Sequence, residues 1–209
     1  MRIMLIGPQG SGKGTQAKKL ADHFQIPHIS PGSLFRLNEA QGTALGAKAS
    51  QYINRGQLVP DEITNAMVAD RLRQSDAQAG FVLDGYPRNV IQADALDAVT
   101  PIDAVVEITL DDAASIARLA ERRECAHGHI YHLTYHPPQQ PGRCDQDGEP
   151  LRQRADDQPE AIRKRLGIYR TETEPLLERY RAVTKVIRVD GNRSIPEVTA
   201  DVFRGLGLS

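Results

Sequence analysis

The sequence predicts an α/β fold in which a parallel sheet of about five strands carries helices on both faces. Short apolar runs of strand length recur along the chain, and longer stretches with helical spacing lie between them. Strands buried on both faces form such continuous apolar runs, and their alternation with helices is typical of βαβ units. A glycine-rich turn also joins the first run directly to the first helical stretch. The expected strands lie at residues 3–6, 27–29, 81–83, 104–108 and 186–189.

The length and charge of the chain limit the classes of protein to which it can belong. With 209 residues, it is long enough for one domain that has its own apolar core and carries an insertion. The 26 basic and 27 acidic residues leave a net charge of −1, which argues against binding to nucleic acid or to an anionic membrane. No apolar run is long enough for a membrane helix or a secretion signal, and two cysteines do not make a disulfide framework. We therefore expect a cytoplasmic protein.

Helices are expected between the strands, over residues 15–24, 62–74 and 113–123. A further helix is expected to begin at Asp157, because this residue precedes Glu160 by three positions, as in a capping box, with Pro159 in the first turn. Beyond it, apolar side chains at helical spacing predict a face that packs on the core: Ile162, Leu166, Tyr169, Leu176 and Tyr180.

Residues 121–157 interrupt the alternating pattern. They hold both cysteines and four of the six histidines, together with several prolines and glycines. Helical periodicity disappears there, and residues 130–135 are typical of one strand of a small hairpin. We interpret this segment as an inserted lid with a small content of β-structure.

The turn after the first strand has the character of a phosphate-binding loop. Its glycines allow backbone N–H groups to approach phosphate oxygens closely, and the start of the following helix adds partial positive charge. Lys13 can reach the β- and γ-phosphates of a nucleotide. The strict pattern has a hydroxyl residue directly after the lysine, whereas here Gly14 intervenes and the hydroxyl arrives at Thr15. The residues expected to bind a nucleotide are Gly10, Ser11, Gly12, Lys13, Gly14 and Thr15.

A second charged motif follows the third expected strand. Asp84 ends this apolar run, so it is expected at the carboxyl edge of the sheet beside the phosphate-binding loop. A carboxylate in that place can hold Mg²⁺, usually through its water shell. Arg88 lies four residues later and can form a bidentate contact with a phosphate. Switches, motors and kinases all use such loops, so this pattern predicts nucleotide binding without choosing the reaction.

Four motifs in register resemble those of the adenylate kinase family, in its long-lid bacterial branch. They are residues 7–16 (GPQGSGKGTQ), 56–62 (GQLVPDE), 84–88 (DGYPR) and 154–157 (RADD). The resemblance extends over essentially the whole chain. It implies a P-loop core at 1–29, 60–120 and 158–209, a helical flap for the nucleoside monophosphate at 30–59, and a lid at 121–157. It also implies a monomer that transfers the terminal phosphoryl group of Mg·ATP reversibly to AMP, giving two ADP.

The resemblance also implies individual roles for residues around the expected cleft. Phosphoryl transfer needs positioning and distributed positive charge rather than a protein nucleophile. The residues implied in catalysis are Lys13, Asp84, Arg88, Arg122, Arg154 and Arg165. Beyond the loop, those implied in ATP binding are Arg118, Arg122, Ile130, Tyr131 and Arg193. Those implied in AMP binding are Pro31, Arg36, Gln57, Leu58, Val59, Gly85, Tyr86, Pro87, Arg88, Gln92, Arg154 and Arg165.

The flap departs from the family pattern. The family usually has Ser-Thr-Gly-Asp where this chain has residues 30–33 as Ser-Pro-Gly-Ser. Pro31 removes a hydroxyl and a backbone donor, and Ser33 removes a carboxylate. We expect weaker or altered acceptor binding with the chemistry retained. Two alternatives stay open: a kinase for CMP, UMP or GMP, and a nucleotide-binding module that has lost catalysis. Gln92 favours adenine, because an amide offers both a donor and an acceptor.

The lid contains a candidate structural zinc site. The resemblance places Cys125 and Cys144 at the first and third ligand positions, with Asp147 in the fourth. The spacing to the second position is one residue short and offers His127, while His129 or His132 could serve instead. The alternatives are a metal-free lid held by hydrogen bonds and a Cys125–Cys144 disulfide.

Overall fold

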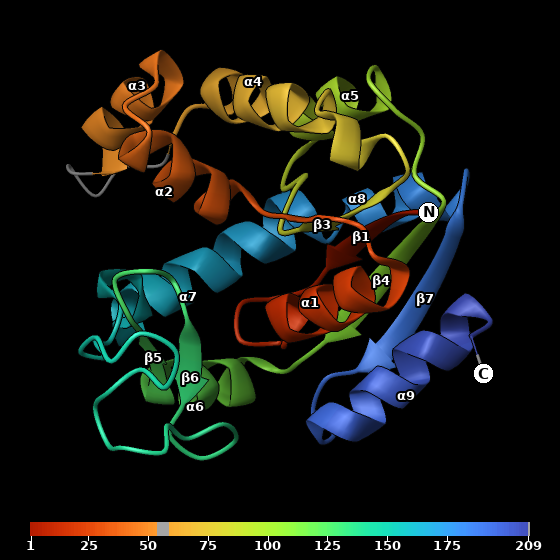
Figure 1. Cartoon of the computed structure of the whole chain (residues 1–209). Coiled ribbons are helices and arrows are strands. Elements are labelled where there is room, and N and C mark those ends of the chain that lie inside the picture. Colours follow the sequence, from red (N-terminus) through yellow and green to blue (C-terminus); the bar gives the residue numbers. More distant parts are fainter. Residues whose placement is uncertain (54–58, 209) are drawn as a thin grey trace.

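The computed structural model describes residues 1–53 and 59–208, and it contains the predicted parallel sheet. The strand order is β2-β3-β1-β4-β7 and all four pairings are parallel (Figure 1). Each predicted strand is confirmed, with ends that differ by no more than one residue. The strands are β1 (Arg2–Ile6), β2 (His28–Ile29), β3 (Phe81–Asp84), β4 (Ala104–Thr109) and β7 (Lys185–Asp190).

The central strand β1 shows why the apolar runs are continuous. Ile3 and Leu5 belong to the apolar cluster on one face of the sheet, while Met4 and Ile6 belong to the cluster on the other. Successive side chains of a strand point to opposite faces, so a strand covered on both faces has no polar side. Helices α1 (Lys13–Phe24) and α9 (Ile195–Leu206) cover the first face and lie in front of the sheet in Figure 1.

The second face is covered by helices from several parts of the chain. These are α4 (Asp61–Leu72), α5 (Val90–Asp97) and α8 (Leu176–Arg181), with the short turn η1 (Ser75–Ala77). Helix α7 (Pro159–Ile168) continues into the π-helical turn η3 (Tyr169–Thr173) before α8 begins. All five apolar residues predicted for this helical face are buried. Among the residues described, none of the helices has the length and apolar character that a membrane span requires.

The segment at 30–53 forms two helices at one end of the molecule, α2 (Pro31–Ala40) and α3 (Ala44–Ile53), at the upper left of Figure 1. Ser30 is the N-cap of α2, its hydroxyl accepts the N–H of Ser33, and Pro31 occupies the first turn. Leu34 and Ala49 join the apolar cluster of the second face. The segment therefore packs on the core through a few apolar side chains.

The lid segment contains little regular structure. After α6 (Asp112–Glu121), strand β5 (Arg122–Glu124) pairs antiparallel with β6 (Ile130–His132), at the lower left of Figure 1. The prediction of a helix over 113–123 was therefore wrong at its end, since Arg122 and Arg123 begin a strand. The predicted strand over 130–135 stops at 132, where a turn begins.

The prediction that Asp157 caps the following helix was also wrong. Asp157 ends the 3-10 turn η2 (Ala155–Asp157), and Gln158 is the N-cap of α7. The Asp157 side chain is fully buried and accepts two hydrogen bonds from Arg122, at 2.8 and 2.6 Å. A buried carboxylate needs such partners, and the arginine offers a stronger interaction than a backbone N–H.

Candidate active site

The loop between β1 and α1 surrounds the side chain of Lys13. Gly10 and Gly12 have φ of 82° and 90°, a region that favours glycine, and a Cβ on Gly7 would lie 2.3 Å from the carbonyl oxygen of Ile108. The Lys13 ammonium donates to the carbonyl oxygens of Gly7 and Pro8, both at 2.7 Å. The sequence thus folds into a tight loop that holds a cation at the end of the central strand.

Desolvation and the surrounding charges lower the pKa of Lys13 to about 8. Partial burial has the largest effect, Asp84 opposes it, and the positive charges of Arg88, Arg165 and Arg122 add to it. The charges of three predicted catalytic arginines thus act on the Lys13 ammonium. An anion that entered this space would therefore meet several positive charges at once.

Asp84 lies beside the start of α1, as predicted from its position at the end of β3. A Cβ on Gly14 would lie 3.3 Å from Asp84 Oδ2, a tight contact, so glycine lets this carboxylate approach without a shift. Burial raises the pKa of Asp84, but the hydrogen bond from His28 and the charge of Lys13 outweigh it and keep this pKa below its usual value. The distance from His28 Nε2 to Asp84 Oδ2 is 3.3 Å. The carboxylate is thus ionised and suited to hold a cation.

His28 was missed in the sequence reasoning. It lies on β2, which pairs with β3, and it opposes Val82 in the register. The signal that could have found it is a polar residue in an apolar run next to the strand that ends in Asp84.

Two aspartates organise the arginines of the lid and of α7. Arg154 pairs with Asp156, with Nε 2.9 Å from Oδ1, and Arg165 reaches the same carboxylate at 2.8 Å. Arg122 pairs with Asp157, which lies 3.8 Å from Arg165. The acids limit the repulsion among three clustered guanidinium groups and fix their orientation. The motif at 154–157 contains both acids, but the sequence reasoning gave Asp156 no role and gave Asp157 only that of a helix cap.

The residues predicted for the acceptor fall into three groups. Gln57 and Leu58 lie outside the described residues. Arg36 and Arg88 are exposed, and Arg88 Nε donates to the carbonyl oxygen of Gly85 at 2.7 Å. The remaining residues are buried or partly buried: Pro31, Val59, Gly85, Tyr86, Pro87, Gln92, Arg154 and Arg165. Tyr86 belongs to the second-face cluster and Val59 packs against it.

Gln92 has an ordered network of its own. Its side-chain amide donates to Asp61 at 2.6 Å, and its carbonyl oxygen accepts the backbone N–H of Arg88 at 2.8 Å. The Tyr86 hydroxyl donates to Asn65 at 2.8 Å. In this arrangement Gln92 positions the backbone at Arg88, a function that the sequence did not indicate.

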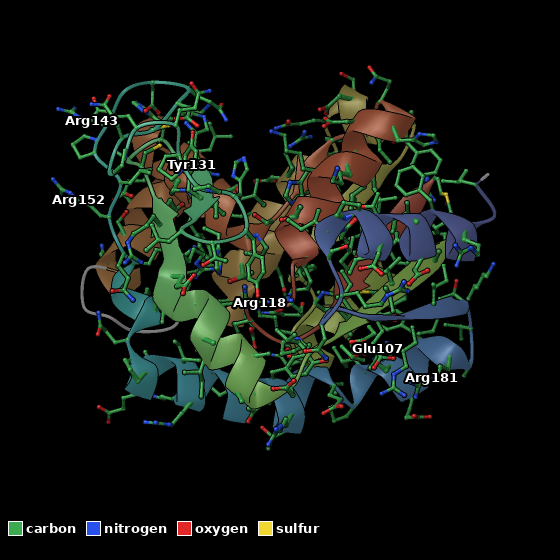
Figure 2. The ribbon with its side chains drawn as sticks, turned by 90° about the horizontal axis from the view of Figure 1, so that it is seen from below. Glu107, Arg118, Tyr131, Arg143, Arg152 and Arg181 are labelled. Atoms are coloured by element: carbon green, nitrogen blue, oxygen red, sulfur yellow. The ribbon has the colours of Figure 1, made fainter. Side chains whose placement is uncertain are left out.

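The residues predicted for the donor base come from α6, from the lid and from the turn before α9. Arg118 on α6 donates to the carbonyl oxygen of Gly10 at 3.4 Å, and its guanidinium lies 5.4 Å from the centre of the Tyr135 ring. Figure 2 shows Arg118 directed toward the middle of the molecule. Ile130 is half-exposed on the lid, and Arg193 pairs with Glu197 at 3.0 Å on α9.

The side chain of Tyr131 lies inside the lid, next to the half-exposed Ile130 (Figure 2). It is 2% exposed, and its hydroxyl accepts the N–H of Asp145 at 2.8 Å and lies 3.5 Å from the Cys144 sulfur. A buried phenol needs a hydrogen-bond partner, and the lid interior provides one.

Four ligand-type side chains meet in the lid. Ligand atoms of Cys125, His129, Cys144 and Asp147 all lie within 4.8 Å of one another. His129 Nδ1 is 2.9 Å from Asp147 Oδ2 and 3.3 Å from the Cys144 sulfur. The predicted ligand His127 contacts only the outer carboxylate, with Nδ1 3.0 Å from Asp147 Oδ2, so His129 replaces it in the group. Since β6 begins at residue 130, His129 lies beside Cys125, whose N–H it accepts.

The donor set fits zinc. Two sulfurs, one imidazole nitrogen and one carboxylate oxygen are all accepted zinc ligands, and four of them suit a tetrahedral structural site. Both cysteines are free, which contradicts the disulfide alternative. The hydrogen bonds among the four side chains are also compatible with a lid held without metal.

Comparisons with known proteins agree with this geometry. The family model of adenylate kinase matches residues 5–185. An adenylate kinase of Streptomyces griseus subsp. griseus is 47% identical over 216 residues, which cover 100% of this chain and 99% of that protein. An adenylate kinase of Thermoanaerobacter sp. is 46% identical over 213 residues, with 99% and 98% covered. One of Symbiobacterium thermophilum is 47% identical over 215 residues, with both chains fully covered. The chain therefore belongs to the adenylate kinase family.

Proposed function

We propose that the loop at residues 7–15, Asp84 and the surrounding arginines form the catalytic site of an ATP:AMP phosphotransferase. As a member of the adenylate kinase family, the chain transfers the terminal phosphoryl group of ATP to AMP and gives two ADP. One observation carries the assignment of residues: Lys13 lies close to Asp84 and within the electrostatic reach of Arg88, Arg122 and Arg165. A group in transfer needs this combination of positioning and positive charge.

The donor phosphates bind at the phosphate loop. Backbone N–H groups of residues 10–15, which include the start of α1, donate to the β- and γ-phosphates, and the Lys13 ammonium exchanges the carbonyl oxygens of Gly7 and Pro8 for phosphate oxygens. When bound with ATP, Mg²⁺ neutralises charge on these phosphates, and Asp84 is the carboxylate that would hold it through its water shell. The adenine of ATP binds between Arg118, Ile130 and the loop at Arg193. Tyr131 supports this pocket from inside the lid.

The acceptor phosphate binds opposite the donor. Arg36, Arg88, Arg154 and Arg165 supply the charge, and the ionised phosphate oxygen attacks the γ-phosphorus in line without a protein base. Gln92 holds the backbone at Arg88 in place, and its amide has donor and acceptor capacity left for the adenine edge. Val59, Gly85, Tyr86 and Pro87 shape this side of the cleft, together with Gln57 and Leu58.

Closure of two segments excludes water from the reaction. We assign residues 30–59 as the flap over the acceptor, residues 121–157 as the lid over the donor, and the rest as the core. Arg122 and Arg154 move with the lid, so its closure completes the set of charges. Since both segments have to move freely, we propose that the protein acts as a monomer. We also propose that it acts in the cytoplasm.

Zinc in this proposal is structural. Cys125, His129, Cys144 and Asp147 would hold it, and the four protein ligands leave no open position for a reacting water. Its contribution is to tie the two ends of the lid loop together.

The test is the initial rate of phosphoryl transfer from Mg·ATP to AMP, dAMP, CMP, UMP and GMP. A strong preference for AMP is expected, and Pro31 and Ser33 would then only adjust affinity. Preference for a pyrimidine or guanine acceptor would keep the mechanism and overturn the acceptor assignment. Tight ATP binding with no transfer to any acceptor would contradict the catalytic proposal.

A further inference from the structure

Glu124 is a lid carboxylate that faces an arginine of the flap. It lies on β5, with Oε1 3.7 Å from Arg36 Nη1 on α2 and Oε2 3.4 Å from Arg154 Nη1 in the lid. Its side chain is only 11% exposed, although it belongs to a small and mostly exposed segment. A nearly buried carboxylate thus joins two segments that have to separate when substrates enter.

The fold fixes the position of this carboxylate. The backbone of Glu124 exchanges two hydrogen bonds of 2.9 Å with Arg152, and in the β5–β6 ladder Glu124 opposes Ile130. Gly128, whose φ of 85° favours glycine, lies beside the contact, and a Cβ there would touch Arg36 Nε at 3.4 Å and Glu124 Oε1 at 3.6 Å. The arrangement therefore results from strand pairing and a close approach, not from a free surface side chain.

The contacts of Glu124 are ion pairs without hydrogen bonds. Both nitrogen–oxygen distances exceed the usual range for a charge-assisted hydrogen bond. Within the part of the chain that the structure describes, Glu124 Oε1 has no hydrogen-bond partner. Glu124 thus attracts both guanidinium groups without holding either by a hydrogen bond, although Arg154 is also paired with Asp156.

We propose that Glu124 is a positioning residue that engages Arg36 and Arg154 while the acceptor site is empty and weakens the binding of the acceptor phosphate. The inference rests on the proposed function, in which both arginines bind that phosphate. A phosphate dianion attracts the two guanidinium groups more strongly than one carboxylate, but it also repels Glu124 at short range. The same ion pairs hold the lid against the flap before the acceptor arrives.

The test compares Glu124→Gln with Glu149→Gln. Glu149 is an exposed acid of the same lid, and it forms no ion pair with the residues that the structure describes, so its variant has the same change of charge without the contact to Arg36. Each variant and the parent are measured for KM with AMP, KM with ATP, and equilibrium binding of AMP by calorimetry. For E124Q we expect the KM and the dissociation constant for AMP to fall about fivefold, with the KM for ATP unchanged. E149Q should match the parent.

A conservative variant separates charge from packing. Glu124→Asp keeps the charge but withdraws it from Arg36, so the affinity for AMP should lie between those of the parent and E124Q. The distance between labels on α3 and in the lid loop should be longer in ligand-free E124Q than in the parent, because the ion pairs that join the segments are lost. A merely structural role of Glu124 would lower the melting temperature without this selective gain in AMP affinity.

Two results would overturn the inference. The first is an E124Q variant whose dissociation constant for AMP equals or exceeds that of the parent. The second is an equal gain in E149Q, which would assign the effect to overall charge. If instead the parent binds AMP but transfers nothing to it, the proposed function fails, while the binding measurement still decides the role of Glu124.

Discussion

The sheet core and the lid are stabilised in different ways. The core has two apolar clusters, one on each face of the sheet, to which every sheet strand contributes. The described part of the lid has one small cluster, Cys125, Tyr131 and Cys144, with Leu151 packed against it. So few apolar side chains cannot offset the conformational entropy of ordering such a segment. The lid therefore depends on polar and metal-binding groups, whereas the core does not.

The two regions also hold their charges differently. In the core, Lys13 is bound by backbone carbonyls of its own loop, so its position follows from the turn. In the lid, Arg122 and Arg154 are held by carboxylates two or more residues away in the chain. The core thus presents a fixed cation, and the lid brings cations that are already paired. We therefore expect substitutions in the phosphate loop to change the rate of the reaction. Substitutions in the interior of the lid, at its metal-binding group and at Tyr131, should instead change stability.

The largest effect is expected for Lys13→Gln. Removing the ammonium should lower kcat on the order of 10²–10³-fold, because positive charge at the transferred group is lost. The melting temperature should change little, since the side chain is only partly buried and its desolvation is unfavourable. The checks are initial rates with AMP and thermal unfolding. A large loss of stability with intact kcat would contradict the expectation that the phosphate loop serves the reaction and not the stability of the protein.

Removal of metal from the lid should lower the melting temperature and change kcat little. If the free zinc concentration is about 100 times the dissociation constant, zinc stabilises the folded protein by roughly 2.7 kcal/mol. A chelator should remove this stabilisation. For a chain of this size, each kcal/mol corresponds to about 2–4 °C in melting temperature. Metal content by elemental mass spectrometry and thermal unfolding with and without chelator are the measurements.

Cys144→Ser is the matched control for the metal. It should contain less than one zinc per chain, melt at a lower temperature and show no further change with chelator. A parent protein that contains no zinc, and whose melting temperature does not respond to chelator, would favour the hydrogen-bonded lid.

The pH dependence of the reaction tests the phosphate loop separately from the lid. Partial burial and neighbouring arginines lower the pKa of Lys13 to about 8 in the ligand-free protein. Its charged form binds phosphate, so kcat/KM for ATP should fall as pH rises through 8, approaching tenfold per pH unit. The decline in kcat should begin at higher pH, because bound phosphates favour the ammonium. Cys144→Ser should keep the same alkaline decline, and a flat kcat/KM profile up to pH 9.5 would contradict the assignment.

The smallest effect is expected for Tyr131→Phe. This change leaves the N–H of Asp145 without its partner in the lid interior and should cost about 1 kcal/mol. Tyr135→Phe is the control, because that side chain is 59% exposed on the same lid and should unfold like the parent. Thermal unfolding in the presence of zinc separates the two variants. Equal stability of both would show that the lid does not depend on its buried hydroxyl.

Much of the fold and part of the site could be predicted from the sequence. The strands were found because burial on both faces requires continuous apolar runs, as at residues 104–108. The phosphate loop was found because its glycines, Lys13 and the preceding strand are neighbours in the chain. Asp84 was placed correctly because the carboxyl ends of parallel strands share one edge. Each of these inferences depends on local pattern or on the general geometry of parallel sheets.

Only the tertiary structure decided which side chains became partners. The capping pattern at Asp157 predicted the wrong residue as the helix cap, because the Asp157 side chain instead makes a buried contact with Arg122, 35 positions away. The lid group includes His129 instead of His127, since the turn before β6 determines which imidazole reaches Cys144. Tyr131 turned out to lie inside the lid for the same reason. Local sequence determines backbone conformation, whereas the partner of a buried polar group depends on residues that only the folded chain brings within hydrogen-bond distance.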